Sequence, residues 1–352
     1  MERNRYSISV ISAVLAVAAL VCTCSTSLAG HYEDKDFSLR FPAALSRFST
    51  YGDVAGYGGA SAGSQWTSSA NPASIAWLDI EGPLQVYAAP QWSRIWFENG
   101  TTFDVFAESL TWDADDYGTF LAAAAQVKSN RRPDKSAGFD FDVSMDIVQG
   151  QWAKKLTEEW AVGFNFGYTK CSSRGEWGPI PLYKSNSDSY NIRVGTLHKL
   201  TEKWKGGLVV DYGWSRDRTN YYAIPAFAAP ERHVYDDTRQ VLVRPGVTYE
   251  YKKNSTVYFD YQFGTFWNNT GTLNVHRVYA GVEHGINDWI YARVGTCLDP
   301  TVETTCAWTC GVGFYPTKWL SFDVGYQYNM FPELVEEFGR SHLLNLSLSL
   351  TF

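Results

Sequence analysis

Histidine, serine and paired carboxylates are the first side chains to examine for chemistry. The chain contains neither a G-x-S-x-G nucleophile elbow nor an H-E-x-x-H zinc motif. Two acidic pairs, 115–116 and 236–237, fall in a predicted turn and a predicted loop, where solvated carboxylates are common. The six histidines are scattered without metal-ligand spacing: His31, His198, His233, His276, His284 and His342. We therefore expect a protein that is not an enzyme and holds no metal or cofactor.

Cysteine chemistry is the second possibility. The six cysteines are Cys22, Cys24, Cys171, Cys297, Cys306 and Cys310. Cys297 and Cys306 flank a short loop, and an exported protein would meet an oxidising compartment, so these two residues are candidates for a disulfide. Alternation of the neighbouring residues places Cys297 on a polar face and Cys306 on an apolar one, which disfavours that bond. Cys306 and Cys310 lie roughly 13 Å apart on a strand, too far to share a metal ion.

The last nine residues, 344–352, indicate the element that organises the chain. Successive side chains of a strand point to opposite faces, so this alternation gives one apolar and one polar face. An aromatic residue that closes such a strand resembles the signal read by the bacterial outer-membrane assembly machinery, here Leu350 and Phe352. The tail thus predicts the closing strand of a transmembrane β-barrel.

The first residues agree with export. Basic residues open the chain, an apolar run covers 8–21, and Ser27-Leu28-Ala29 follows. This order predicts a signal peptide over 1–29, cleaved after Ala29. Lipidation of a cysteine within that segment is the alternative, and it is disfavoured because neither cysteine follows Gly, Ala or Ser.

Composition fits a barrel better than a soluble core or a nucleic-acid-binding protein. Beyond 1–29 no apolar run approaches the roughly 20 residues of a membrane helix. Aromatic residues make up 16% of the chain, which suits aromatic belts at membrane interfaces. The net charge of −7 argues against binding to nucleic acid.

A repeated sequence pattern marks the boundaries between successive strands. A strand ends, a tight polar turn follows, and a Trp opens the next strand at 155–160, 200–204, 286–289 and 316–319, while the turn at 252–255 lacks the Trp. We predict an all-β chain of fourteen strands: 84–97, 101–111, 117–128, 139–153, 159–171, 187–199, 203–217, 238–251, 255–267, 272–285, 289–298, 304–315, 318–330 and 341–352. An even number of strands puts both ends of the barrel-forming chain in the periplasm and the longer connections (129–138, 172–186, 218–237, 331–340) outside.

Charges recur on the predicted inner face. We expect them to pair with one another, to anchor a plug or to line a wet pore, and we expect His276 to pack in the lumen. The predicted lumen charges are Asp140, Asp142, Asp146, Arg193, Asp211, Arg244, Glu250, Asp260, Arg277, Glu283, Arg293 and Asp323.

The segment 30–80 does not alternate. A stretch of small residues at 56–63 is followed by Asn71-Pro72-Ala73 just before the first strand. Pro72 restricts Asn71 to extended or turn geometry, and small residues let irregular backbone pack inside a barrel. The alternative is a flexible periplasmic tail.

This phrase resembles the hatch of the FadL-type family of outer-membrane transporters for long-chain fatty acids. The resemblance implies a signal peptide (1–29), a hatch (30–80) and a fourteen-stranded barrel (81–352). Carried over by motif, the gating residues would be Gly58, Gly59, Asn71, Pro72 and Ala73.

The resemblance implies passive, hatch-gated uptake of small hydrophobic molecules, fatty-acid-like or aromatic, by an integral outer-membrane protein. Its partners would be outer-membrane lipid, the assembly machinery and the hydrophobic ligand. Pro90 and Pro245 lie within predicted strands and could mark kinks that open the wall or ordinary bulges. Two alternatives stay open: a PorV-type barrel that binds a secreted or periplasmic protein as an adaptor, and a general diffusion porin.

Overall fold

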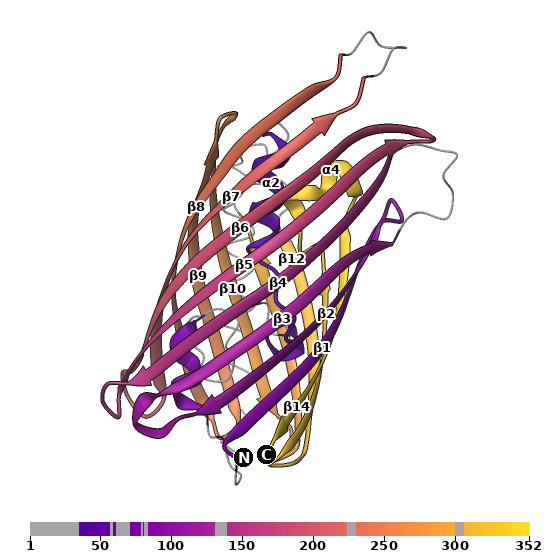
Figure 1. The fold of residues 1–352 in the computed structure, drawn as a ribbon. Helices are drawn as coiled ribbons and strands as arrows, with labels where there is room; N and C mark the ends of the chain where they lie inside the picture. Colours follow the sequence, from indigo (N-terminus) through magenta and orange to yellow (C-terminus); the bar gives the residue numbers. More distant parts are fainter. Residues whose placement is uncertain are drawn as a thin grey trace.

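Strands in which apolar and polar residues alternate close into a barrel around three short helices (Figure 1). The computed structural model describes residues 35–56, 59–60, 71–78, 80, 84–130, 139–223, 230–299 and 306–352. The predicted signal peptide, both of its cysteines and Gly58 lie outside these residues. The elements are α2 (Phe37–Leu45), α3 (Gly52–Gly56), η3 (Pro72–Trp77), β1 (Val86–Phe97), β2 (Thr102–Asp113), η4 (Asp115–Tyr117), β3 (Thr119–Asn130), β4 (Phe139–Lys155), β5 (Trp160–Trp177), β6 (Ile180–Lys199), β7 (Trp204–Tyr221), β8 (Arg232–Lys252), β9 (Ser255–Asn268), β10 (Gly271–Gly285), β11 (Ile290–Leu298), β12 (Cys306–Thr317), β13 (Leu320–Tyr328), η6 (Pro332–Leu334), α4 (Val335–Phe338) and β14 (Ser341–Thr351).

The barrel closes by pairing its last strand with its first. Within the described residues, fourteen antiparallel strands follow one another in sequence order, and β14 lies between β13 and β1. Leu350 is opposite Ala88 on one side and Leu320 on the other. The Phe352 N–H donates to the Val86 carbonyl at 2.8 Å. The predicted strand number and the closing role of the last strand are confirmed.

The two barrel ends differ. The turn end carries the tight turns and the two closing strand ends, and the loop end carries the longer connections (Figure 1). Trp160, Trp204, Trp289 and Trp319 follow tight turns and are exposed on the outer surface at the turn end. Such a row is typical of the aromatic belt at a membrane interface.

Two predicted loops are in fact strand. β5 and β6 run to a tight turn around Gly178, where a connection over 172–186 was expected, and β7 and β8 take up much of 218–237. The sequence signal is lost there because both faces of these strand ends are polar, while the backbone ladder continues unchanged. One outer row alternates in charge from strand to strand: Asp146, Lys170, Asp188, Arg216 and Asp237.

The three helices before β1, here called the inner helices (α2, α3 and η3), lie inside the barrel (Figure 1). α2 packs against β9, β10 and η6, α3 against β11 to β14, and η3 against β3 to β6. The alternative of a flexible periplasmic tail is therefore wrong for these helices. Within the described ranges, no helix is long and apolar enough to cross a membrane.

Candidate functional site

Asn71-Pro72-Ala73 attaches the inner helices to the wall at the turn end. Asn71 caps η3, because its Oδ1 accepts a hydrogen bond from the Ala73 N–H at 3.0 Å. The Asn71 Nδ2 donates to the Thr196 carbonyl at 2.9 Å, and the Gln151 Nε2 donates to the Pro72 carbonyl at 3.1 Å. The tripeptide therefore binds two different strands, β6 and β4.

Two wall glycines make room for that attachment. A Cβ on Gly195 would lie 2.1 Å from the Asn71 Oδ1, and a Cβ on Gly163 would lie 2.3 Å from the Pro72 carbonyl carbon. Both glycines face inward on neighbouring strands, directly opposite each other. The close approach of the segment to the wall therefore requires glycine at these positions.

The inner helices and the described residues that connect them, between 35 and 80, are here called the inner segment, and the middle of this segment is held by backbone contacts. Gly59 adopts a φ of 83°, and its carbonyl accepts a hydrogen bond from the Arg244 guanidinium. The Thr309 Oγ1 donates to the Gly56 carbonyl at 3.0 Å, and the Gln327 Nε2 donates to the Ala55 carbonyl at 3.0 Å. Inner-wall polar groups thus satisfy the backbone of α3 and of the turn that follows it.

Asp53, on α3, adds a third carboxyl group near Arg293, which already pairs with two carboxylates of the wall. The Arg293 guanidinium lies 2.7 Å from Glu283 and 2.6 Å from Asp323. Burial and, to a smaller extent, the Asp323 carboxylate raise the pKa of Asp53 against the lowering effect of Arg293, with a net result of about 7. Three carboxyl groups thus share one guanidinium.

The structure places Arg193, Arg244, Arg277 and Arg293 on the inner wall, each beside a carboxylate. Arg193 is 2.8 Å from Asp211, and Arg244 is 2.9 Å from Asp260. The lumen is therefore lined by compensated charges, and two of these arginines also contact the inner helices or the segment after α2.

The expectation that Asp142 faces the lumen is wrong. Its neighbours Phe141 and Val143 are buried in the inner apolar cluster, whereas the Asp142 side chain is 42% exposed and lies 3.7 Å from Arg174. The side chain of Asp140 lies outside the described residues. Near the loop end the inner face packs against α2, so wall residues there are apolar inside and polar outside, the reverse of the pattern at mid-barrel.

His276 and Asp146 also lie on the outer face, contrary to the expectation that they face the lumen. His276 lies on the outer face and is hydrogen-bonded to the Tyr261 hydroxyl at 2.6 Å, while its neighbour Arg277 is buried inside. Asp146 is exposed and accepts from Gln126 at 3.0 Å. Cys297 is buried and faces the lumen, whereas Cys306 is opposite Leu298 on the other face of the wall, as the alternation predicted.

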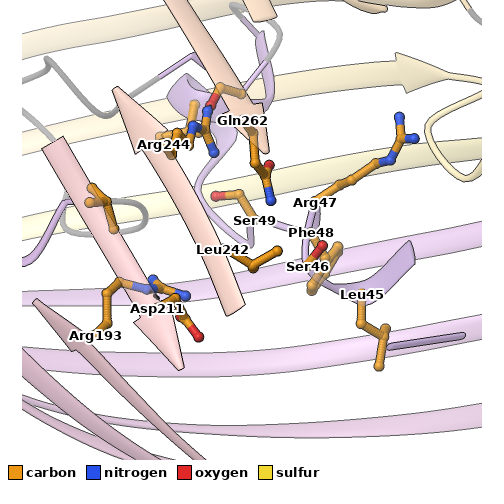
Figure 2. A pocket seen from close by; sticks show the side chains of 13 residues that line it. Leu45, Ser46, Arg47, Phe48, Ser49, Arg193, Asp211, Leu242, Arg244 and Gln262 are labelled. Carbon is orange, nitrogen blue, oxygen red and sulfur yellow. Dashed lines mark hydrogen bonds and ion pairs between the residues drawn. The ribbon is translucent and has the colours of Figure 1, made fainter. Parts of the chain in front are cut away.

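A cavity of about 110 Å³ lies between the segment that follows α2 and the wall of β6 to β9 (Figure 2). Its lining is mixed, with guanidinium, carboxylate and amide groups beside aliphatic and aromatic side chains. The lining comprises Leu45, Ser46, Arg47, Phe48, Ser49, Val54, Gly59, Arg193, Val209, Asp211, Leu242, Arg244 and Gln262.

The wall beside this cavity has a weak seam at Pro245. Pairing of β8 with β7 is continuous through Pro245, but pairing with β9 skips from Val243 to Gly246 without a change of register. Proline has no N–H to donate to the ladder. Arg244 and Gln262, which line the cavity, flank this gap.

Pro90 makes a similar seam between β1 and β14. Pairing skips from Ala88 to Gln91, again with the register preserved, while pairing with β2 is continuous. Both prolines therefore produce gaps in the ladder, not bulges. Inside the wall at Pro90, the Gln91 side chain is hydrogen-bonded to Thr50 of the inner segment.

A group of charged residues near the loop end was not anticipated from the sequence. Arg40 and Arg47 of the inner segment contact acids that follow β11 and β13. These residues lie outside regular strands, so alternation carries no signal for them. Only the barrel brings together positions almost 300 residues apart.

No protein-family model matches the sequence, and no curated protein sequence matches it. Solved structures do share its fold. The Pseudomonas putida toluene transporter TodX aligns with a TM-score of 0.55 at 11% identity, over 86% of this chain and 98% of TodX. A Pseudomonas aeruginosa FadL homologue gives 0.60 at 12% identity, over 86% and 98%. The monoaromatic hydrocarbon channel CymD gives 0.52 at 12% identity, over 86% and 99%. The resemblance drawn from Asn71-Pro72-Ala73 is confirmed at the level of the fold.

Proposed function

We propose that this protein is an outer-membrane channel for passive uptake of small hydrophobic molecules, gated by the inner segment. The observation that carries the proposal is the cavity against the Pro245 seam, which gives a bound molecule a place beside a weakened part of the wall. The fold shared with the toluene transporter TodX, the monoaromatic hydrocarbon channel CymD and a FadL homologue supports the same reading. In this scheme the turn end faces the periplasm and the loop end faces outward.

Cavity size supports a gate. A cavity of about 150 Å³ lined by apolar residues accommodates benzene, so the 110 Å³ here suits at most one small ring or part of a chain. A larger molecule would need the segment that carries Leu45 to Ser49 to move. The hatch of residues 30–80, held against the wall by contacts at Asn71, Pro72 and Gly59, would be the part that shifts.

The lining chemistry restricts the ligand class. Leu45, Phe48, Val209 and Leu242 supply apolar surface, whereas Arg193 and Arg244 supply guanidinium groups already paired with carboxylates. This combination suits an aromatic ring or an apolar body with one polar end, since a ring can stack on a guanidinium plane. A wholly aliphatic passage would need fewer charges.

The test fills the cavity without changing the outer wall. Val209 lines the cavity and is 4% exposed, and the adjacent Val210 points outward and is 40% exposed. We expect Val209→Phe to lower uptake of a labelled small aromatic in cells lacking their own transporter, because the added ring occupies the cavity. Val210→Phe is the matched control and should transport normally. Equal uptake by both variants, with both assembled, would contradict the role of the cavity.

A further inference from the structure

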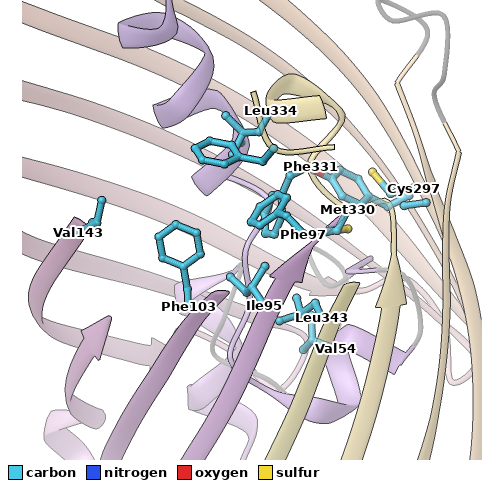
Figure 3. Packing of buried hydrophobic residues seen from close by; sticks show 14 of the residues in the cluster. Val54, Ile95, Phe97, Phe103, Val143, Cys297, Met330, Phe331, Leu334 and Leu343 are labelled. Atoms are coloured by element: carbon cyan, nitrogen blue, oxygen red, sulfur yellow. The ribbon is translucent and has the colours of Figure 1, made fainter. Parts of the chain in front are cut away.

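The connection between β13 and β14, residues 329–340 and here called the cap, folds over the loop end of the lumen. It contains η6 and α4, and its apolar side chains pack against the inner segment and the wall (Figure 3). The Phe331 ring lies 6.5 Å from Phe48, and the Phe338 ring lies 6.3 Å from Phe37. The cap therefore covers α2 and the segment that leads to the cavity.

A buried group of four charges ties the cap to the inner segment. Arg47, Arg277, Asp299 and Glu333 all have side chains that are 0% exposed. The Glu333 carboxylate lies 2.6 Å from Arg47 and 2.7 Å from Arg277. Asp299 pairs with Arg47 as well and lies 3.4 Å from Arg277. Two positive and two negative groups thus balance within the protein interior.

Glu333 is the member of this group that the cap supplies. Arg47 comes from the segment after α2, and Arg277 and Asp299 come from the barrel wall and its rim. Arg277 also donates to the Ala43 carbonyl and the Ser46 hydroxyl, both at 2.7 Å. Lifting the cap would therefore remove one carboxylate from two arginines that hold the inner segment.

A second contact reinforces the first at the rim. Arg40 of α2 donates to the Glu337 carboxylate at 3.0 Å and to the Glu333 carbonyl at 3.1 Å. Glu336 lies 3.3 Å from the same guanidinium but is 54% exposed. Solvent weakens an exposed pair of this kind, whereas loss of a partner from a fully buried group leaves an uncompensated charge.

We propose that the cap and α2 form a latch held by Glu333, which keeps the loop end closed until both release together. Because the buried group is complete only when the cap is down, partial opening leaves buried charge unpaired, and this favours two discrete states. The latch rests on the proposed function, since it controls access to the same cavity: Arg47 and Phe48 contact the cap and also line the cavity.

A native thiol reports the state of the latch without any substrate. Cys297 is 0% exposed, and its Sγ lies 3.5 Å from the Arg47 guanidinium beneath the cap. In a chain with every other cysteine replaced by alanine, the rate of maleimide labelling measures how often this site opens. Heat-modifiable gel migration checks that the barrel is folded.

We expect Glu333→Gln to raise the labelling rate of Cys297 at least about tenfold, because one buried carboxylate is lost. Glu336→Gln is the matched control on the same cap and should change the rate less than about twofold. A second variant, Glu333→Ala, is included because the glutamine could still hydrogen-bond the two arginines and hold the cap closed. Unchanged labelling in both Glu333 variants, or an equal rise in Glu336→Gln, would overturn the latch. A Glu333-dependent rate in a protein that transports nothing would keep the latch and reject the proposed function.

Discussion

At the residue scale, the contacts that fix the inner segment depend on glycines in the wall and on a buried carboxyl group with a raised pKa. Gly163 and Gly195 leave room for Asn71 and Pro72 to pack against the wall. Asp53 joins a cluster that contains more carboxyl groups than guanidinium groups. The sequence predicted that Asn71, Pro72 and Ala73 matter, because the tripeptide could be matched to a hatch. It could not predict which glycines receive them, since pairing between strands cannot be read from one chain.

Replacing Gly195 with Ala should displace Asn71 and leave the barrel assembled. The added Cβ would lie 2.1 Å from Oδ1, so the hydrogen bond to the Thr196 carbonyl should be lost, at a cost of about 1–3 kcal/mol in attachment of the segment. Hydrogen exchange at the Ala73 amide measures this. Gly150→Ala is the control, because its Cβ would have nothing within 4 Å. Unchanged Ala73 exchange in the Gly195 variant would contradict the packing described here.

Attachment of α3 should weaken as the pH rises from about 4 to about 7. The pKa of Asp53 is raised from 3.8 to about 7 when α3 is docked, so the docked state retains a proton that the released state loses over this range. Exchange protection of the Ala55 and Gly59 amides, corrected for intrinsic rates, should therefore be greater at pH 5 than at pH 8. Asp53→Asn should remove this dependence. Persistence of the full pH effect in that variant would assign it to another group.

At the element scale, the strands were predictable where they cross between lipid and lumen. Apolar and polar residues alternate there, as in 344–352, and the predicted count of fourteen is correct. The outer ends of β5 to β8 were missed because water or polar groups border both faces. The prolines were located from the sequence, but their effect was not predicted: pairing is interrupted at each proline while the register is preserved, where kinks or bulges were expected.

Replacing Pro245 with Val should restore a ladder donor at the seam beside the cavity. One added backbone hydrogen bond is worth about 0.5–1.5 kcal/mol, so uptake should fall roughly two- to tenfold if molecules leave through this seam. Pro90→Val is the control, because it closes the other seam, whose strands β1 and β14 contribute no residue to the lining of the cavity. Uptake is measured with equal amounts of assembled protein. Equal rates for both variants and the wild type would place the exit elsewhere.

At the scale of the whole molecule, the barrel wall changes character along its axis. At mid-barrel the inner face is polar and charged, and near the loop end it is apolar and packs on α2 and the cap. Sequence reasoning that assumed one inner polarity throughout therefore misplaced Asp142, whereas His276 lies outside because it alternates with the inward-facing Arg277. The cavity and the latch could not be predicted either, because both depend on where an irregular segment lies inside a closed barrel.

The most direct test of this account is uptake of a labelled long-chain fatty acid and of a small labelled aromatic by cells that lack their own transporter. Wild type would be compared with the Asn71→Ala, Pro72→Ala double variant after assembly of both is confirmed. The account predicts that wild type takes up at least one probe faster than cells with an empty vector. It also predicts that the variant, with its inner segment detached from the wall, takes up this probe at a rate different from that of wild type. Normal assembly of wild type with uptake of neither probe would contradict it.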